Sequence, residues 1–598
     1  RQVPTVAKRV LDTSTGQSTF DPIVEVHIPH NTLDESAAGN NTFDINYIYG
    51  FSSGGFSYFI ATQLEDFRTG GSPLYTKIVR LCQEDSSAEM NSYIELPLVC
   101  KSSDGVNYNL AKSAFITTVG TDLYDAAVPE GEVLFVTFSV DGFETSPDAS
   151  VVCMYPTRTI NERFVDRITE CARGDTSNTE IDWLGSRRCA VSVSLIDLID
   201  GAGSNYCHTS DVNHPLGGLK LPIEAQSLYS DTSTVTAVAA VHHQQSTVVF
   251  LGDEHGHFKK ISVLSPTEAR LYGDILVVPG RPVVQNGLML STNRDYIYIM
   301  TQRKITRIPV QNCQEYTTCE DCLAARDPYC GWCTLEKRCS TRTLATCHQS
   351  TVAGSNRWLD SNSPCVEITH TDPPSLHVTS PQTTIIIQLQ QLPALHGNQT
   401  YQCRFGNLLV ATRLLDNQTV LCDTPAAIDL PPIPPNNDHV TVQLQLFSSE
   451  TGVDFISTEF YFFDCSALIS CTACVSRWHC YWCVFANMCT RQVTNCDIQG
   501  ETVISGMQAS SSEGYDQGSQ FCPRVLSRTQ KLVPVGVNAD ISVLVSNLTV
   551  VGICCEKVET IDIYKYRCIV IFTVHQTKDI ITMWLFFDGK FENRLPAI

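Results

Sequence analysis

Two clusters of cysteines constrain this chain more than any other feature of its sequence. The first cluster begins C-x5-C-x2-C-x7-C-x2-C-x5-C, and the second begins C-x5-C-x2-C-x5-C-x2-C-x5-C. Trp332 and Trp482 each stand immediately before the fifth cysteine of their cluster. One small module therefore occurs twice. Its cysteines are Cys313, Cys319, Cys322, Cys330, Cys333, Cys339, Cys347 and Cys365 in the first copy, and Cys465, Cys471, Cys474, Cys480, Cys483, Cys489, Cys496 and Cys522 in the second.

Disulfide bonds explain these clusters better than zinc or a redox centre. Each module spans roughly fifty residues, too few to bury a large core, so crosslinks worth about 2–4 kcal/mol each are the usual remedy. A zinc ion would use four cysteines and leave the other four of each cluster unexplained. The neighbouring sequences "AARDP" and "VSRWH" do not build the strand-to-helix turn that a redox C-x-x-C motif needs. We therefore expect disulfides and an oxidising compartment.

Four Asn-x-Ser/Thr triplets agree with that compartment, and we predict glycosylation at each. They lie at Asn40, Asn398, Asn417 and Asn547.

The charge and hydropathy of the chain exclude several classes of partner. A formal net charge of −22 disfavours nucleic acids and anionic membrane surfaces, since both are bound by clustered Lys and Arg. The most apolar segment, residues 568–587, is interrupted by polar residues and does not resemble a membrane-spanning helix. The N-terminus lacks the apolar core of a signal peptide. We therefore expect a processed or excised part of a longer product.

Residues 1–312 carry short apolar strand signals separated by Gly, Pro and Asp. Examples are "FSYFIATQ" (56–63), "VLFVTFSV" (133–140), "TVVFLGD" (247–253) and "YIYIMTQ" (296–302). Short strands repeated over such a length predict a β-propeller or a large sandwich, with one helical insertion at 163–172. Six cysteines in this region allow fifteen disulfide connectivities. They are Cys82, Cys100, Cys153, Cys171, Cys189 and Cys207.

Two further segments are rich in strand signals. Residues 370–464 contain "HVTVQLQLF", in which apolar and polar residues alternate, and two cysteines, Cys403 and Cys422. This predicts a sandwich of immunoglobulin-like size, with the proline-rich "LPPIPPNND" (430–438) as a loop. Residues 525–598 predict another such unit. It holds an odd set of three cysteines, so one is free or pairs elsewhere; they are Cys554, Cys555 and Cys568.

The order of these segments resembles the ectodomain of the plexin family. The specific matches include "YGFSSGGFSYFIATQ" (49–63), "FLGDEHGHFKKI" (250–261), "PYCGWC" (328–333) and "FDCSALISCTACV" (463–475). The resemblance implies an all-β fold with a seven-bladed sema propeller, whose first blades are missing from this chain. It divides the chain into propeller (1–312), PSI module (313–366), IPT sandwich (367–464), second PSI module (465–523) and partial second IPT sandwich (524–598).

The resemblance also implies a disulfide pairing. For the propeller and the first sandwich the implied pairs are Cys82–Cys207, Cys100–Cys153, Cys171–Cys189 and Cys403–Cys422. For the first PSI module they are Cys313–Cys330, Cys319–Cys365, Cys322–Cys339 and Cys333–Cys347. For the second they are Cys465–Cys480, Cys471–Cys522, Cys474–Cys489 and Cys483–Cys496.

No catalytic, metal or cofactor site emerges from the sequence. A metal cluster of His242, His243, His255 and His257 is one interpretation, but an exposed turn at "GDEHGH" is favoured. Arg173-Gly174-Asp175 is an integrin-type tripeptide that occurs often by chance. The two module tryptophans are expected in module cores rather than on ligand platforms. We therefore expect no enzymatic activity and no cofactor.

The resemblance implies the extracellular region of a single-pass cell-surface receptor that binds a semaphorin through its propeller and serves guidance and cell–cell signalling. Self-association and a co-receptor are further partners to consider. The cysteine modules would act as stiff wedges that fix the angles between domains. One alternative is an ectodomain of the hepatocyte growth factor receptor type, which has a single PSI module before its IPT domains. Another is a secreted β-propeller enzyme, which would need converging carboxylates or an arginine cluster.

Overall fold

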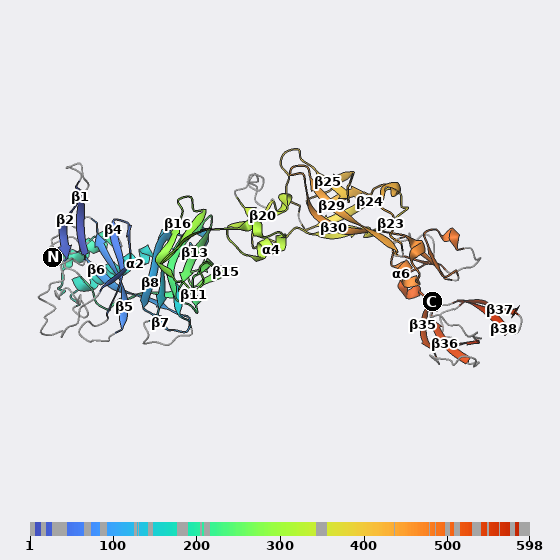
Figure 1. The fold of residues 1–598 in the computed structure, drawn as a ribbon, viewed down its shortest axis with the longest axis horizontal. Coiled ribbons are helices and arrows are strands. Elements are labelled where there is room, and N and C mark those ends of the chain that lie inside the picture. Colours follow the sequence, from blue (N-terminus) through green and yellow to red (C-terminus); the bar gives the residue numbers. More distant parts are fainter. Residues whose placement is uncertain are drawn as a thin grey trace. The chain divides into compact units, whose positions relative to one another are not determined.

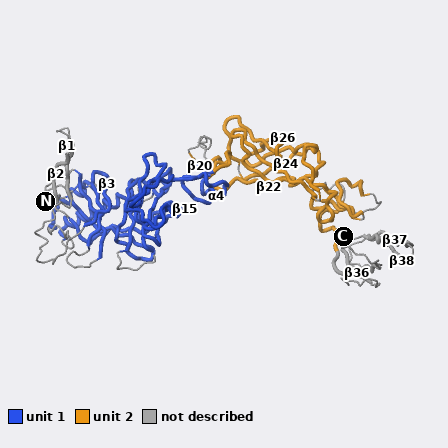
Figure 2. Tube along the Cα trace, in the orientation of Figure 1, with its two compact units in different colours: residues 1–331, 339–341, 360–362 blue, residues 332–338, 342–359, 363–598 orange. Residues whose placement is uncertain are grey.

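The structure is a computed structural model in which residues 45–524 are described apart from short stretches. Those stretches are 65–72, 84–91, 125–127, 129–130, 141–147, 176–188, 204–205, 208–215, 343–355, 391, 436, 478, 485, 497–502 and 507–514. Outside 45–524 the backbone of seven strand segments is described, at 6–12, 19–26, 525–528, 540–546, 549–560, 563–573 and 580–584. The chain forms two compact units (Figure 2): 1–331 with 339–341 and 360–362, and 332–338 with 342–359 and 363–598.

The first unit consists of blade-like antiparallel sheets, so the all-β, propeller-like expectation is confirmed (Figure 1). The four segments quoted from the sequence coincide with observed strands, and two of them, 133–140 and 296–302, extend one residue beyond the strand. One sheet contains β3 (Asn46–Ser53), β4 (Phe56–Leu64), β5 (Leu74–Cys82) and β6 (Ile94–Lys101), with β7 (Asn107–Tyr108) beside β6. This nine-stranded sheet continues from β6 to β11 (Ile223–Asp231), which pairs with β6 in parallel, and then to β10 (Ser150–Pro156), β9 (Glu132–Ser139) and β8 (Leu110–Thr118).

The two remaining sheets of this unit are smaller. One contains β12 (Val235–His243), β13 (Ser246–Asp253), β14 (His257–Ser265) and β15 (Glu268–Leu276). The other contains β16 (Val283–Leu290), β17 (Tyr296–Thr301) and β18 (Ile305–Pro309). A separate hairpin pairs β1 (Val6–Asp12) with β2 (Thr19–Val26). One hydrophobic core is filled by residues of β9, β10 and β11 together with residues of β12, β13 and β14, so the two larger sheets pack against each other.

A polar network joins β3 and β8, the two edge strands of the nine-stranded sheet, to β12 and β16. The Asn286 amide on β16 donates to the Ile48 carbonyl of β3 at 2.7 Å, and the Ser113 hydroxyl of β8 donates to Asn286 Oδ1 at 2.5 Å. The same hydroxyl accepts from the Val238 amide of β12 at 3.1 Å. Because Asn286 has a positive φ of 53°, its side chain leaves the regular strand geometry at this point. These bonds tie the four strands to one another.

The predicted helical insertion is present and starts earlier than expected. Helix α2 (Thr157–Ala172) and helix α3 (Val193–Ala202) lie between β10 and β11 of one sheet. Proline at 156 precedes α2, and the Ser192 hydroxyl caps α3 by accepting from the Leu195 amide. Ile160, Phe164 and Ile168 on α2 are fully buried against the sheets. The helices are therefore an integral part of the first unit's core.

The first cysteine module combines short elements. They are η3 (Cys313–Glu315), α4 (Cys319–Ala324), β19 (Cys330–Cys333), η4 (Thr334–Glu336), β20 (Arg338–Thr341) and β21 (Trp358–Leu359). A further short helix, η1 (Thr121–Leu123), lies outside the module, between β8 and β9. Trp332 is buried and pairs across β19 and β21 with Leu359. The interpretation of this tryptophan as core therefore agrees with its burial.

Residues 368–463 form a two-sheet sandwich. One sheet holds β22 (Ile368–Asp372), β24 (Thr384–Leu389), β28 (Thr419–Asp423) and β27 (Thr412–Leu414). The other holds β23 (Ser375–His377), β30 (Val453–Phe463), β29 (His439–Ser448), β25 (Tyr401–Phe405) and β26 (Leu408–Val410). The alternating residues of β29 point into the core as predicted; these are Val440, Val442, Leu444 and Leu446. The turn η5 (Ala427–Asp429) opens the proline-rich connection.

The second cysteine module repeats the plan of the first. It contains η6 (Cys465–Ala467), α6 (Cys471–Val475), β31 (Tyr481–Cys483), β32 (Met488–Thr490), η7 (Val493–Asn495), β33 (Val503–Ser505), β34 (Asp516–Gln517) and η9 (Ser519–Phe521). Trp482 lies in its buried core. After it come β35 (Arg524–Arg528), β36 (Asp540–Ser546), β37 (Thr549–Thr560), β38 (Ile563–Thr573) and β39 (Ile580–Trp584), and the backbone register sets Cys555 opposite Cys568.

Candidate ligand-binding surface

A buried arginine fixes the helical insertion to the neighbouring sheet. Arg80 on β5 donates to Asn161 Oδ1 of α2 at 3.1 Å and to the Tyr206 carbonyl at 3.3 Å. Its guanidinium lies over the rings of Phe56 and Phe164, 4.3 and 4.9 Å from their centroids. Burial lowers the pKa of Arg80 to about 10, which still leaves the side chain charged at neutral pH. The charge is therefore retained and satisfied inside the protein.

A second buried arginine and two disulfides complete this attachment. The fully buried Arg167 donates to the Gly217 carbonyl at 3.4 Å and pairs with Glu170 at 3.4 Å. Burial lowers the pKa of Arg167, and the Glu170 carboxylate opposes that shift. The bond Cys171–Cys189 spans the insertion itself, and Cys82–Cys207 ties its far side to β5. The insertion is therefore held rigidly by covalent and polar contacts.

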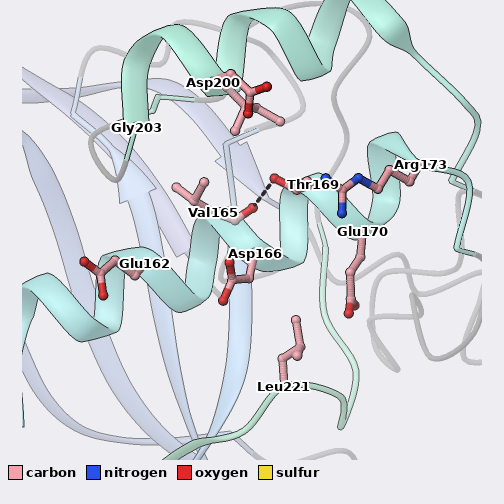
Figure 3. A pocket seen from close by; sticks show the side chains of 10 residues that line it. Glu162, Val165, Asp166, Thr169, Glu170, Arg173, Asp200, Gly203 and Leu221 are labelled. Carbon is pink, nitrogen blue, oxygen red and sulfur yellow. Dashed lines mark hydrogen bonds between the residues drawn. The ribbon is translucent and has the colours of Figure 1, made fainter.

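Between α2 and α3 lies an open groove with an acidic lining (Figure 3). Glu162, Asp166 and Glu170 project from successive turns of α2, since residues four apart share one face of a helix. Asp200 contributes to the lining from α3, and the groove encloses about 560 Å³. Arg173 is the one cation among the lining residues. A surface of this kind attracts cationic groups.

Apolar side chains accompany these carboxylates. Val165, Ile199 and Leu221 contribute to the lining of the groove. On and beside α3, Val191 is 72% exposed, Val193 68% and Leu198 58%, although a residue of this type is more often buried. Exposed apolar side chains next to a charged rim are typical of protein-binding surfaces. The groove and α3 together form the candidate surface, which we call the insertion face.

The sequence analysis did not identify this face. Only the second half of α2 was predicted, and α3 was given no role. The signal that could have found the face was the spacing of Glu162, Asp166 and Glu170 along one helix. The groove itself depends on Asp200 and Leu221, which are distant in sequence and are brought in by folding.

The integrin-type tripeptide lies at the end of this face. Asp175 forms an ion pair with Lys220 at 2.6 Å, and Gly174 has a positive φ of 85°. Arg173 is exposed and lines the groove. Because the Asp175 carboxylate is paired with Lys220 of the same chain, the tripeptide does not offer a free carboxylate to a partner.

The four histidines considered as a metal cluster have separate partners. His257 Nδ1 lies 2.7 Å from Asp274, and His242 Nδ1 lies 2.8 Å from the Thr118 hydroxyl. His255 lies in the exposed turn, and His243 stacks on Tyr329 with ring centroids 4.2 Å apart. The group with metal-ligand spacing that the described residues do contain is Cys465, Cys480 and Cys489. Those sulfurs are in disulfides.

The disulfide bonds of the structure coincide with pairs that the family resemblance implies. Those bonds are Cys82–Cys207, Cys100–Cys153, Cys171–Cys189, Cys313–Cys330, Cys322–Cys339, Cys403–Cys422, Cys465–Cys480, Cys471–Cys522, Cys474–Cys489 and Cys483–Cys496. Cys319, Cys333 and Cys365 are also disulfide-bonded. Cys347 lies outside the described residues.

Two of the four predicted glycosylation sequons lie within the described residues, and two lie outside them. Asn398 and Asn417 are exposed on the sandwich, where a glycan could be carried. Asn40 and Asn547 lie outside the described residues. Glycosylation at all four stays a prediction.

Within the second unit, the first cysteine module contacts the sandwich through a buried ion pair. Arg357 pairs with Glu450 through both guanidinium nitrogens, and the side chains are 3% and 9% exposed. Arg357 also donates to the Ala394 carbonyl at 2.8 Å, and the Thr451 hydroxyl donates to the Leu335 carbonyl at 2.6 Å. The hydrogen bonds from Arg357 hold the pKa of Glu450 below its usual value. We call this contact the first joint.

The sandwich contacts the second cysteine module through different chemistry. His377 lies 3.4 Å from Asp464, and Arg491 of the module donates to the Thr379 hydroxyl at 2.5 Å. Arg477 lies over the Phe463 ring at 5.5 Å. Phe463 ends a strand of the sandwich and yet is buried in the core of the module. We call this contact the second joint.

No helix of the described residues is long and apolar enough to cross a membrane.

Comparison with known proteins finds the same domain series. Family models match the sema domain at residues 112–291, the plexin repeat (PSI) at 312–366 and the plexin TIG domain at 372–463. Human Plexin-A2 is 34% identical over 537 residues, 88% of this chain and 26% of the relative. Zebrafish Plexin A3 is 35% identical over 541 residues, 88% of this chain and 27% of the relative. The chain thus spans about a quarter of the length of these relatives.

A solved structure of the full extracellular region of Plexin A4 has the same fold. It superimposes with a TM-score of 0.73 at 28% sequence identity and covers 97% of this chain and 64% of its own. The similarity therefore extends through both compact units.

Proposed function

The chain belongs to the plexin family and corresponds to part of a plexin extracellular region, and from this premise we propose that it is a semaphorin-binding receptor segment. As part of that region it lies on the outer side of the plasma membrane. Semaphorin is the ligand that the family implies, and the propeller is the domain that would bind it. The observation that carries the proposal is the matched series of sema, PSI and TIG domains along one chain.

We place the ligand contact on the insertion face. Its helices are fixed by Arg80, Arg167 and two disulfides, so little ordering entropy is lost when a partner binds. Its carboxylates favour a basic partner surface and would raise the association rate. Val193 and Leu198 supply exposed apolar area, which adds to affinity where water is excluded.

The segment acts by binding alone in this proposal. The open groove holds carboxylates from α2 and α3, but the histidines weighed as possible ligands are dispersed over other partners. The second cysteine module, with its four disulfides, distinguishes the chain from the hepatocyte growth factor receptor type, which has one such module before its IPT domains.

Surface plasmon resonance with purified semaphorin ectodomains tests both parts of this proposal. The intact chain should bind at least one semaphorin, and affinity should fall with added salt because charge contributes. The double variant Asp166→Lys with Asp200→Lys should lose about tenfold or more in affinity through slower association. The matched control is Glu268→Lys with Glu320→Lys, two exposed carboxylates on β15 and α4, and it should bind like the intact chain.

The possible results distinguish the proposed receptor function from the proposed contact surface. If no semaphorin binds the intact chain, the receptor function is wrong. If a semaphorin binds the intact chain and the Asp166/Asp200 variant equally well, the function stands and the insertion face is not its contact surface.

A further inference from the structure

His377 is held in one protonation state by the geometry of the second joint. Its side chain is 8% exposed at the end of β23. Nδ1 accepts from the Thr379 backbone amide at 3.1 Å, and a backbone N–H can only donate, so Nδ1 carries no proton. The ring proton is therefore on Nε2, which lies 3.4 Å from Asp464 Oδ1. The neutral tautomer satisfies both nitrogens.

The turn that His377 stabilises is part of the contact with the cysteine module. The Thr379 hydroxyl lies 3.0 Å from His377 Nδ1 and accepts from Arg491 of the module at 2.5 Å. The Val378 amide donates to the Phe463 carbonyl at 2.9 Å, and the His377 ring packs edge-on against the Phe463 ring. Loss of the His377–Thr379 bond would thus disturb both sides of the joint.

Taken together, burial and the charged groups around His377 disfavour the positively charged imidazolium form, which carries protons on both ring nitrogens. Among the residues that the structure describes, Asp464 is the carboxylate in contact with the ring, and Arg491 is the cation near it. Across Phe463 lie His439, paired with Asp438, and Arg477, while His479 also lies near Arg491. Burial first, and Arg491 next, lower the pKa of His377, and Asp464 only partly opposes them.

A proton on Nδ1 would face the Thr379 amide, so the ring must leave that amide before it can be charged. We propose that the second joint is a pH-sensitive contact that opens when His377 becomes protonated. Mildly acidic compartments entered by internalised surface proteins would then loosen the sandwich from the second cysteine module. The first joint differs, because it is held by the buried Arg357–Glu450 ion pair, and the histidine beside it, His396, is exposed and bonds Glu450 through its backbone amide.

The direction follows from proton linkage. The open joint exposes a histidine with an ordinary pKa of about 6.5, whereas the closed joint holds it lower, so the open state binds more protons. The closed joint is therefore most stable above about pH 6.5. As the pH falls from there toward the closed-state pKa, the opening constant should rise about fivefold over the first pH unit and then approach a tenfold rise per unit.

Hydrogen exchange with mass spectrometry on the whole chain tests this, after correction for the pH dependence of intrinsic exchange. Peptides covering 377–380 should exchange about fivefold faster at pH 5.5 than at pH 6.5 after that correction, because half of the open-state histidines are already protonated at pH 6.5. The variant His377→Asn keeps an acceptor for the Thr379 amide, through an Asx-type bond, but has no titrating ring. In that variant the same peptides should exchange at a rate independent of pH.

His370→Asn is the matched control, since His370 is exposed on β22 of the same sandwich and should leave the wild-type pH dependence unchanged. A pH dependence that persists in His377→Asn, or its absence in the native chain, would overturn the proposal. Peptides from β29 report whether the His377→Asn sandwich is folded. If they lose protection at pH 7.5, Asp464→Asn replaces it as the test variant; it removes the carboxylate that raises the closed-state pKa, so opening should still begin near pH 6.5 but continue to increase to a lower pH than in the native chain.

Discussion

The two cysteine modules share a covalent plan but contact the sandwich between them by different means. In the first, Cys313–Cys330 and Cys322–Cys339 each enclose a separation of 17 residues, and in the second, Cys465–Cys480 and Cys474–Cys489 each enclose 15. Yet the first joint relies on the permanent ion pair of Arg357 and Glu450, and the second on His377 with Asp464 and Arg491.

This difference shows that the crosslinks and the joints are set by separate parts of the sequence. Disulfides fix the internal fold of each module because they restrict the unfolded chain. The residues between the cysteines decide how firmly, and at which pH, a module holds its neighbour. A receptor built from repeated modules can thus have one rigid joint and one responsive joint.

The largest expected loss of stability follows from removing the disulfide that closes a long loop in the second cysteine module. Replacing Cys471 and Cys522 by Ser should destabilise the second module by about 4 kcal/mol, against about 3 kcal/mol for Cys465 and Cys480. The sequence separations are 51 and 15 residues, and the longer loop loses more entropy when closed. Urea-dependent hydrogen exchange within the module measures both. Equal losses would mean that loop length does not govern the module's stability.

The next test breaks the first joint. Arg357→Met leaves Glu450 buried without its partner, so local stability at that joint should fall by about 3 kcal/mol. Arg413→Met is the control, because its pair with Asp423 is exposed and should be worth less than about 1 kcal/mol. Hydrogen exchange of the Thr334 amide, which donates to the Arg357 carbonyl at 2.9 Å, provides the measurement. Similar losses in both variants would contradict the role given to the buried pair.

A smaller effect distinguishes the joints by pH in one sample. Between pH 7.5 and 5.5 the Thr334 amide should keep its protection, because the lowered pKa of Glu450 keeps that carboxylate charged above its ordinary pKa of about 4.3. The Thr379 amide should lose protection as the pH falls below about 6.5, by an amount that approaches about 1.4 kcal/mol per pH unit. If both amides respond alike, the two joints are not chemically distinct.

The smallest expected loss of stability comes from removing the N-cap of the short helix that each cysteine module contains. The Thr318 hydroxyl caps α4 by accepting from the Asp321 amide at 3.1 Å, and the Ser470 hydroxyl caps α6 by accepting from the Ala473 amide at 3.3 Å. Thr318→Ala and Ser470→Ala should each cost about 1 kcal/mol of local stability. Thermal and urea scans of the two variants compare them. A cost in one module alone would show that the repeated helices are not equivalent.

Much of the fold could be predicted from the sequence because its signals are local. The alternation of Val440, Val442 and Leu444 identifies a strand with one buried face, and the repeated cysteine spacing identifies the modules. The insertion was predicted only in part, since α2 begins at Thr157, directly after Pro156 at the end of β10, where sequence periodicity gave no boundary. The domain boundaries remain predictions.

The candidate sites depended on long-range contacts that no local pattern reveals. Arg80 and Asn161 are 81 residues apart, and Arg357 and Glu450 are 93 apart, yet both pairs are buried and bonded. Charged residues are rarely buried unless they are paired. The partner of a buried arginine is known only once the chain has folded, so the sequence does not distinguish a buried arginine from an exposed one. His377 was likewise given no role, since its partners come from three separate segments.

The account rests on the sixteen cysteines of the two clusters being oxidised in pairs. Alkylation of the denatured chain without reductant, followed by peptide mass spectrometry and zinc analysis, tests this directly. We expect these cysteines unmodified, disulfide-linked peptides joining Cys313 to Cys330 and Cys465 to Cys480, and no bound zinc. Alkylated cysteines throughout both clusters, or zinc in stoichiometric amount, would contradict the extracellular receptor assignment.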